Sequence, residues 1–290
     1  MNETLTATFK YLGLIYCIIF PLIRKFTNLI ENKKLKNIFK DMVATFELCA
    51  INYEIVVGAQ VQASYYSELH FFILTCMTTL LWVEYWHEVR ACPNEIVEHM
   101  FAAQKSVLFC ISLIFAELLS SYVAFRFMTE IWNTFLPFKR TSVGCSKTFD
   151  KDLVLSAFIC ELLLTIASRL SIYCVIPLKR YIGDIKQEFL LIFVISLYRT
   201  IGFSLYASFN NPVLGACVRY GCPKIDLFQN VLVYWIAPIC GSVYSMYILQ
   251  WCRTFINYLR IRSCEQTPPP DNKFFALFDN DIPIDIFAHA

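Results

Sequence analysis

Six apolar segments, each close to the length of a membrane-crossing helix, limit what this chain can fold into. A spanning helix needs about 20 apolar residues. The composition agrees, because 57% of the chain is hydrophobic, only 17% is charged and the mean hydropathy is +0.52. Soluble domains rarely have such a composition. The sequence therefore predicts an all-α polytopic membrane bundle with spans at 42–59, 67–86, 106–128, 153–174, 188–207 and 229–252.

Several other classes of protein are disfavoured. The net charge of +2 gives no indication of nucleic-acid binding, and the 13 cysteines lie scattered in apolar runs instead of forming a secreted disulfide framework. His87-Glu88 begins like a zinc-protease helix but lacks the second histidine. No Gly-rich phosphate loop or nucleophile elbow is present. We therefore expect no enzyme activity, no metal site and no cofactor.

Charge at the two ends of the chain indicates its orientation. Basic residues gather at 24–40 and at 253–262, which places both ends in the cytosol, although the basic stretch 139–151 disagrees. Residues 11–23 are apolar but short and contain Pro21, so an interfacial or half-inserted helix is favoured over a seventh span.

We divide the chain by hydropathy into three parts. These are an N-terminal cytosolic or interfacial segment, 1–37, a channel-like domain, 38–255, and a flexible cytosolic tail, 256–290. The middle domain has halves 38–130 and 150–255.

Two short apolar segments, 92–99 and 211–218, are left over between spans at matching places in the two halves. Each has a proline near its start. An asparagine such as Asn211 caps a helix, and Pro212 is tolerated at the first helical position. Interrupted short segments at corresponding positions of two halves point to a binding site near the bilayer midplane. We predict two re-entrant half-helices within an inverted repeat.

An acidic residue precedes each half-helix at a similar spacing. Glu161 in the fourth span precedes Pro212, and Asp41 precedes Pro93 at nearly the same distance. Glu47 is an alternative for the first position, since it lies deeper in its span. Both halves then share one order of acid, span, span, half-helix and span.

With these features the chain resembles the aquaporins, and within them the superaquaporin branch. The resemblance covers roughly 38–252 and is stronger in the second half. The matching residues are 44–49, Glu161, Asn211-Pro212-Val213, 233–238 and Cys222.

The resemblance implies an hourglass pore that passively conducts water or small neutral solutes such as glycerol. It also implies a homotetramer in an intracellular membrane such as the endoplasmic reticulum, with the plasma membrane as the alternative. A non-conducting structural or regulatory protein of internal membranes is the second hypothesis, because the first motif is irregular. A receptor-like protein is a third, which an odd number of spans would favour.

The pore motifs implied by the family differ between the halves. The second motif, Asn211-Pro212-Val213, matches the family, whereas the first motif is Cys92-Pro93-Asn94. Cys92 takes the asparagine position, and a thiol is a poor cap and a weak donor. Asn94 follows two positions later, so the sequence leaves open whether it faces the pore.

The resemblance also maps an outer constriction. Leu214 stands where the family has an arginine, Arg199 takes the fifth-span position, Phe72 or Phe71 matches the second-span aromatic, and Ser208 forms the remaining wall. One interpretation is that Arg199 replaces the missing positive charge. The other is that Arg199 reaches the interface or pairs with a carboxylate.

The remaining candidates are structural. The family favours Asp41 (or Glu47) and Glu161 as buried acceptors for backbone N–H groups of the half-helices, over a proton relay. Cys222 is expected to anchor the structure through a disulfide or packing, with thiol reactivity as the less favoured alternative.

Overall fold

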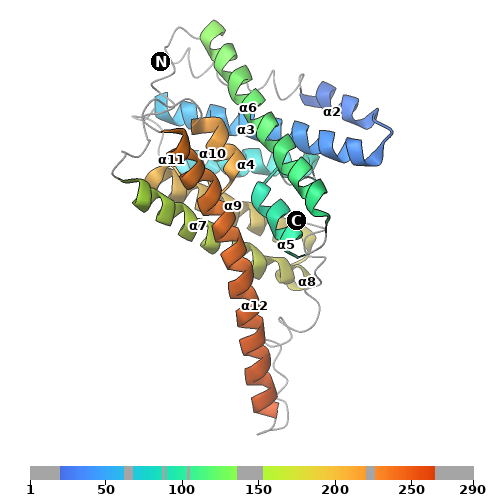
Figure 1. The fold of residues 1–290 in the computed structure, drawn as a ribbon, viewed down its shortest axis with the longest axis vertical. Helices are drawn as coiled ribbons and strands as arrows, with labels where there is room; N and C mark the ends of the chain where they lie inside the picture. Colours follow the sequence, from blue (N-terminus) through green and yellow to red (C-terminus); the bar gives the residue numbers. More distant parts are fainter. Residues whose placement is uncertain are drawn as a thin grey trace.

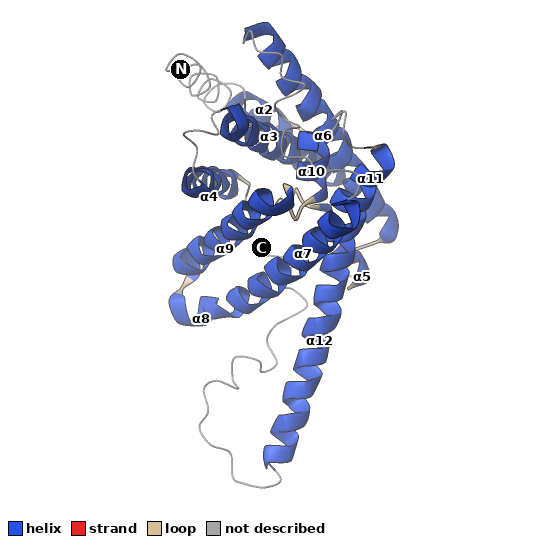
Figure 2. Cartoon of the chain, turned by 90° about the vertical axis from the view of Figure 1, so that its left-hand side faces the viewer, coloured by secondary structure: helices blue, strands red, loops and turns tan. Residues whose placement is uncertain are grey.

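The computed structural model describes residues 20–61, 68–86, 89, 91–102, 105–135, 153–219 and 226–264. Every regular element in these ranges is helical (Figure 2). Five expectations lie outside the described residues, wholly or in part. They concern His87-Glu88, Cys222, the basic stretch 139–151, most of the segment 11–23 and the tail beyond Cys264.

The long helices coincide with the predicted spans. They are α3 (Lys33–Val61), α4 (Glu68–Tyr85), α6 (Val107–Phe135), α7 (Val154–Val175), α9 (Asp184–Tyr206) and the last span, made of α11 (Leu227–Val231), η5 (Leu232–Ile236) and α12 (Ala237–Cys264). Five stretches in the described residues are long and apolar enough to cross a membrane. The remaining long helix, α4, has 18 residues and carries Glu68, His70 and Glu84.

The outer surface fits a lipid environment. Large apolar side chains are exposed on several helices, among them Leu108 at 80%, Phe115 at 68%, Leu155 at 70% and Ile185 at 72%. Soluble monomers rarely expose apolar surface on this scale. The all-helical structure is therefore that of a polytopic membrane bundle.

Two helices extend past the limits drawn from hydropathy. α3 begins at Lys33, where Asn32 Oδ1 accepts hydrogen bonds from the backbone N–H groups of Lys34 (3.0 Å) and Leu35 (3.2 Å). Asparagine is a preferred N-cap and lysine a good helix former. The boundary at 37/38 thus falls inside α3, and that at 255/256 falls inside α12, which projects from the bundle in Figure 1.

The two left-over segments form short helices, α5 (Pro93–Phe101) and α10 (Pro212–Arg219). Each carries its proline at the first helical position, where the missing N–H costs nothing. α10, from the second half, packs against α3 and α6 of the first, while α5 packs against α6 and α12. α3 pairs with α6, α7 with α12 and α4 with α9, so the halves interlock.

A further helix, α2 (Phe20–Asn28), packs against α3. Phe20 is fully buried, and its ring meets that of Phe46 edge-on at a centroid distance of 6.2 Å. Arg24 of α2 forms an ion pair with Glu47 of α3, the residue next to Phe46. Residues 20–24, the part of the apolar N-terminal segment that the structure describes, therefore contact the first span at Phe46 and Glu47.

Two glycines permit close helix contacts. A Cβ at Gly241 of α12 would lie 2.8 Å from the Leu162 carbonyl oxygen on α7, and one at Gly215 of α10 would lie 2.7 Å from Tyr234 Cβ. Both distances are shorter than real Cβ contacts. These glycines bring α12 against α7, and α10 against η5.

Candidate functional site

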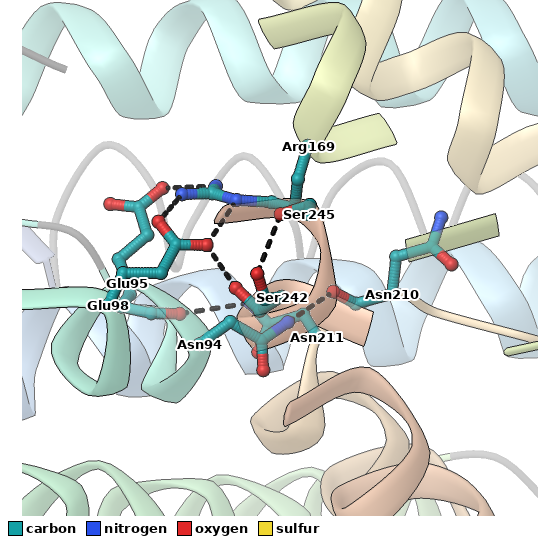
Figure 3. Close-up of polar contacts among 9 residues, drawn as sticks. Asn94, Glu95, Glu98, Arg169, Asn210, Asn211, Ser242 and Ser245 are labelled. Carbon is teal, nitrogen blue, oxygen red and sulfur yellow. Dashed lines mark hydrogen bonds and ion pairs between the residues drawn. The ribbon is translucent and has the colours of Figure 1, made fainter. Parts of the chain in front are cut away.

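The two half-helices begin next to each other and exchange hydrogen bonds (Figure 3). Asn94 Nδ2 donates to the carbonyl oxygen of Asn210 at 3.1 Å, and Asn211 Nδ2 donates to that of Ala91 at 3.0 Å. The accepting residues have left-handed backbone, with φ of 48° at Ala91 and 54° at Asn210. Each lies two positions before the proline of its own half-helix.

The two half-helices are capped differently. Asn211 Oδ1 accepts from the backbone N–H of Val213 at 3.1 Å, which is an N-cap. Cys92, at the N-cap of α5, makes no side-chain cap hydrogen bond to the described residues. The first motif thus obtains its contact to the second half from Asn94, while the start of α5 lacks the cap that Asn211 provides to α10.

One face of α7 contacts the approach to α10. Glu161, 1% exposed, accepts hydrogen bonds from the backbone N–H of Phe209 (3.2 Å) and of Asn210 (2.7 Å). These residues immediately precede the second motif. The carboxylate therefore lies in position for the acceptor role expected from the sequence.

Two turns further along α7, Arg169 binds the first half-helix. Its Nε donates to Glu98 Oε1 at 2.8 Å, its Nη1 to Glu95 Oε1 at 2.9 Å, and its Nη2 forms an ion pair with Glu98 Oε2 (Figure 3). Ser242 of α12 also donates to Glu98. Sequence reasoning missed this buried network, although an arginine within an apolar span was a usable signal.

The two alternatives for the first acid have different surroundings. Glu47, fully buried, accepts from Trp86 Nε1 at 2.9 Å and from Arg24 Nε at 3.2 Å. Trp86 lies on the segment that leads to the first motif. Asp41 instead lines a cavity of about 130 Å³ between α3, α5 and α6, together with Lys40 and Lys105. Glu47 thus binds a side chain of the approach to α5 directly, whereas Asp41 lines a cavity that Val89 and Ile96 also line.

The four residues of the predicted constriction have separate neighbours in the described structure. Phe72 meets Phe193 edge-on at a centroid distance of 5.4 Å. Arg199 Nη1 lies 3.4 Å from Thr79 Oγ1 on α4, inside the bundle, so its described partner is a hydroxyl and not a carboxylate. Ser208, just before α10, is 2% exposed, and Leu214, within α10, is 0% exposed.

A buried aromatic row runs from α4 to η5. The Phe71 and Phe203 rings stack at 4.5 Å, Phe203 lies 6.4 Å from Phe209, and Phe209 lies 6.0 Å from Tyr234. Arg219, 1% exposed, stands 5.7 Å from the Phe209 ring at the C-terminal end of α10. A cation is favoured at that negative helix end. Sequence reasoning missed Arg219 because it lies beyond the motif.

A known protein is similar to this chain in sequence. No family model matches the chain. Aquaporin-11 from the tardigrade Milnesium tardigradum is 24% identical over 233 residues, which span 78% of this chain and 81% of that protein. The chain resembles the aquaporin family, and within it the superaquaporin type. The chain is a multi-pass membrane protein, and the family that it resembles consists of channels.

Proposed function

We propose that this aquaporin-like protein is a passive channel for water and small neutral solutes such as glycerol. The observation that carries the proposal is the meeting of the α5 and α10 starts, joined through Asn94 and Asn211. Helix N-termini carry partial positive charge. Two such ends directed at one point repel cations and protons while leaving a neutral solute unaffected.

The asparagine amides keep donors for a solute. A side-chain amide has two N–H groups, and the bond from Asn211 to Ala91 uses one of them. The bond from Asn94 to Asn210 likewise uses one. We assign both motifs to the pore on this basis, including Cys92 and Val213, with Asn211 and Asn94 as its donors.

Arg199 supplies the positive charge of the constriction in this proposal. Its guanidinium points toward α4 from α9 and is always charged at neutral pH. Leu214 cannot contribute charge at the position of the family arginine. Phe72 and Ser208 complete the constriction as neutral wall residues, and Glu161 with Glu47 (or Asp41) holds the half-helices.

A specific observation supports a second candidate, a non-conducting structural or regulatory protein. The aromatic row of Phe71, Phe203, Phe209 and Tyr234 fills space beside the second motif. All four side chains are less than 9% exposed. A pore closed there would keep the aquaporin-like fold without conducting.

The resemblance to aquaporins also suggests an oligomeric state and a membrane in which the protein resides. The proposal includes a homotetramer in an intracellular membrane such as the endoplasmic reticulum, with the plasma membrane as the alternative. The exposed apolar side chains of the bundle suit contact with lipid or with neighbouring subunits. Cys222 retains a proposed structural role.

Reconstitution distinguishes the two candidates. The purified full-length chain is inserted into liposomes, and stopped-flow light scattering follows their shrinking in an osmotic gradient. Conduction predicts faster shrinking than in empty liposomes and a low activation energy. A rate equal to that of empty liposomes, with the protein folded and inserted, would support the non-conducting candidate.

A further inference from the structure

The start of α5 faces a buried carboxylate that has no hydrogen-bond partner among the described residues. Glu117 of α6 is fully buried, and in the described part of the chain neither of its oxygens meets the geometry of a hydrogen bond. Glu47, Glu98 and Glu161, which are equally buried, each have donors. An ionisable group at bilayer depth is costly and usually functional.

The surroundings of Glu117 indicate what it does. α6, which carries Glu117, packs against α5, and the groups that act electrostatically on its carboxyl are the backbone N–H of Cys92 and the acids Asp41 and Glu95. The first N–H groups of a helix lack partners within the helix. A negative charge near them is stabilising. Glu117 is therefore next to the start of α5, where Cys92 leaves the cap absent.

α6 contacts both half-helix starts with one face. Ser121 follows Glu117 by four positions, which places both side chains on the same side of the helix. Ser121 Oγ donates to the carbonyl oxygen of Val213, at the start of α10, at 2.8 Å. Glu117, one turn earlier, faces the start of α5.

In the second half of the same molecule, an acid on another helix already accepts hydrogen bonds from the backbone that leads into a half-helix. There the acid Glu161 accepts from the backbone N–H groups of Phe209 and Asn210, just before α10. On α3, Glu47 is already occupied by Arg24 and Trp86, and Asp41 lines the cavity that also contains Lys40 and Lys105. Glu95 on α5 itself is paired with Arg169. Among the described acids near the start of α5, Glu117 is the fully buried one whose oxygens lack a hydrogen-bond partner.

We propose that Glu117 caps α5 from another helix and thereby performs the role that Cys92 cannot. Glu117 is a positioning residue, since it orders the first turn of α5. That turn carries Asn94, whose amide reaches the second half. The consequence for permeation rests on the proposed function, whereas the capping itself does not.

Hydrogen–deuterium exchange of the purified full-length chain in lipid nanodiscs tests the capping. Glu117→Leu removes the acceptor, and Glu117→Gln removes only the charge. We expect exchange of the α5 amides to rise roughly fivefold in Glu117→Leu, the factor for a lost N-cap, and less in Glu117→Gln. Exchange of the α10 amides should stay unchanged. Glu130→Gln, on the exposed side of the same α6, is the matched control.

Rescue separates capping from general stability. Cys92→Asn supplies a side-chain cap, so the double variant Cys92→Asn with Glu117→Leu should return α5 exchange to the parent rate. If Glu117 is only an unfavourable buried charge, Glu117→Leu raises the melting temperature and leaves α5 exchange unchanged or slower. That result, or a failure of Cys92→Asn to rescue, would overturn the proposal.

Water flux in liposomes supplies an independent measurement. When the parent conducts, Glu117→Leu should lower its water permeability and Cys92→Asn should restore it. Unchanged permeability together with unchanged α5 exchange also overturns the proposal. When the parent does not conduct, the channel proposal fails, while the exchange experiment still decides whether Glu117 caps α5.

Discussion

Asn94 and Asn211 make equivalent hydrogen bonds from non-equivalent positions. Asn211 directly precedes Pro212, whereas Asn94 directly follows Pro93, yet each amide donates to the carbonyl of a left-handed residue before the opposite half-helix, at 3.0 and 3.1 Å. The pair joins the two halves at their centre. The irregular first motif thus keeps the link between halves and loses only the side-chain cap.

A negative charge at the second motif should weaken cation exclusion. Asn211→Asp replaces an amide donor with a carboxylate at the positive end of α10, which attracts cations. We expect increased ion leak with water flux equal to or below that of the parent. The measurement is ion and water flux in liposomes, with the exposed Asn37→Asp as control. If both fluxes match the parent, Asn211 has no role in the pore.

Shortening Arg199 should change the selectivity of the constriction. Arg199→Ala removes a large charged side chain from between α9 and α4. We expect glycerol permeability to rise more than water permeability, and Leu214→Arg in that background to restore part of the discrimination. Exposed Arg126→Ala is the control. An unchanged ratio of glycerol to water permeability, at normal protein levels, would remove Arg199 from the site.

The ion pair of α2 with α3 should contribute to stability. Arg24→Ala leaves the fully buried Glu47 without its main partner, and breaking a buried pair in this way costs roughly 3 kcal/mol or more. Adding Glu47→Gln should recover most of that loss. Denaturant unfolding in detergent measures both. If Arg24→Ala is as stable as the parent, the ion pair between Arg24 and Glu47 does not contribute to stability.

The contact between α12 and α7 should not tolerate a larger residue at position 241. Gly241→Ala places a methyl group 2.8 Å from the Leu162 carbonyl oxygen, and overpacking of this kind costs about 1–3 kcal/mol. Gly58→Ala is the matched control, because its added methyl group meets no atom within 4 Å. Thermal unfolding should rank Gly241→Ala below the parent and Gly58→Ala at or above it.

Both ends of the chain should lie on the cytosolic side. The basic flanks at 24–40 and 253–262 indicate this orientation. Tags at the two ends should be equally accessible to protease in sealed vesicles of known orientation, with a lumenal marker protein as control. Opposite protection of the two tags would indicate a seventh crossing by the N-terminal segment.

The sequence alone predicted the six long helices and the two short helices α5 and α10. Apolar runs predicted the spans, and the proline at the first helical position predicted the starts of α5 and α10, because hydropathy and capping depend on neighbouring residues. The agreement for α10 is close, since 211–218 was expected and Pro212–Arg219 is observed.

Only the tertiary structure decided which buried charges meet. Arg169 and Glu98 are 71 positions apart, and Arg24 and Glu47 are 23 apart. The partners of Asp41 and Glu47, and the hydrogen bond from Asn94 to the second half, depend on how each helix is rotated in the bundle. A charged side chain buried at bilayer depth needs a partner, and helix packing decides which side chain that is. The local sequence carries little information about the rotation of each helix.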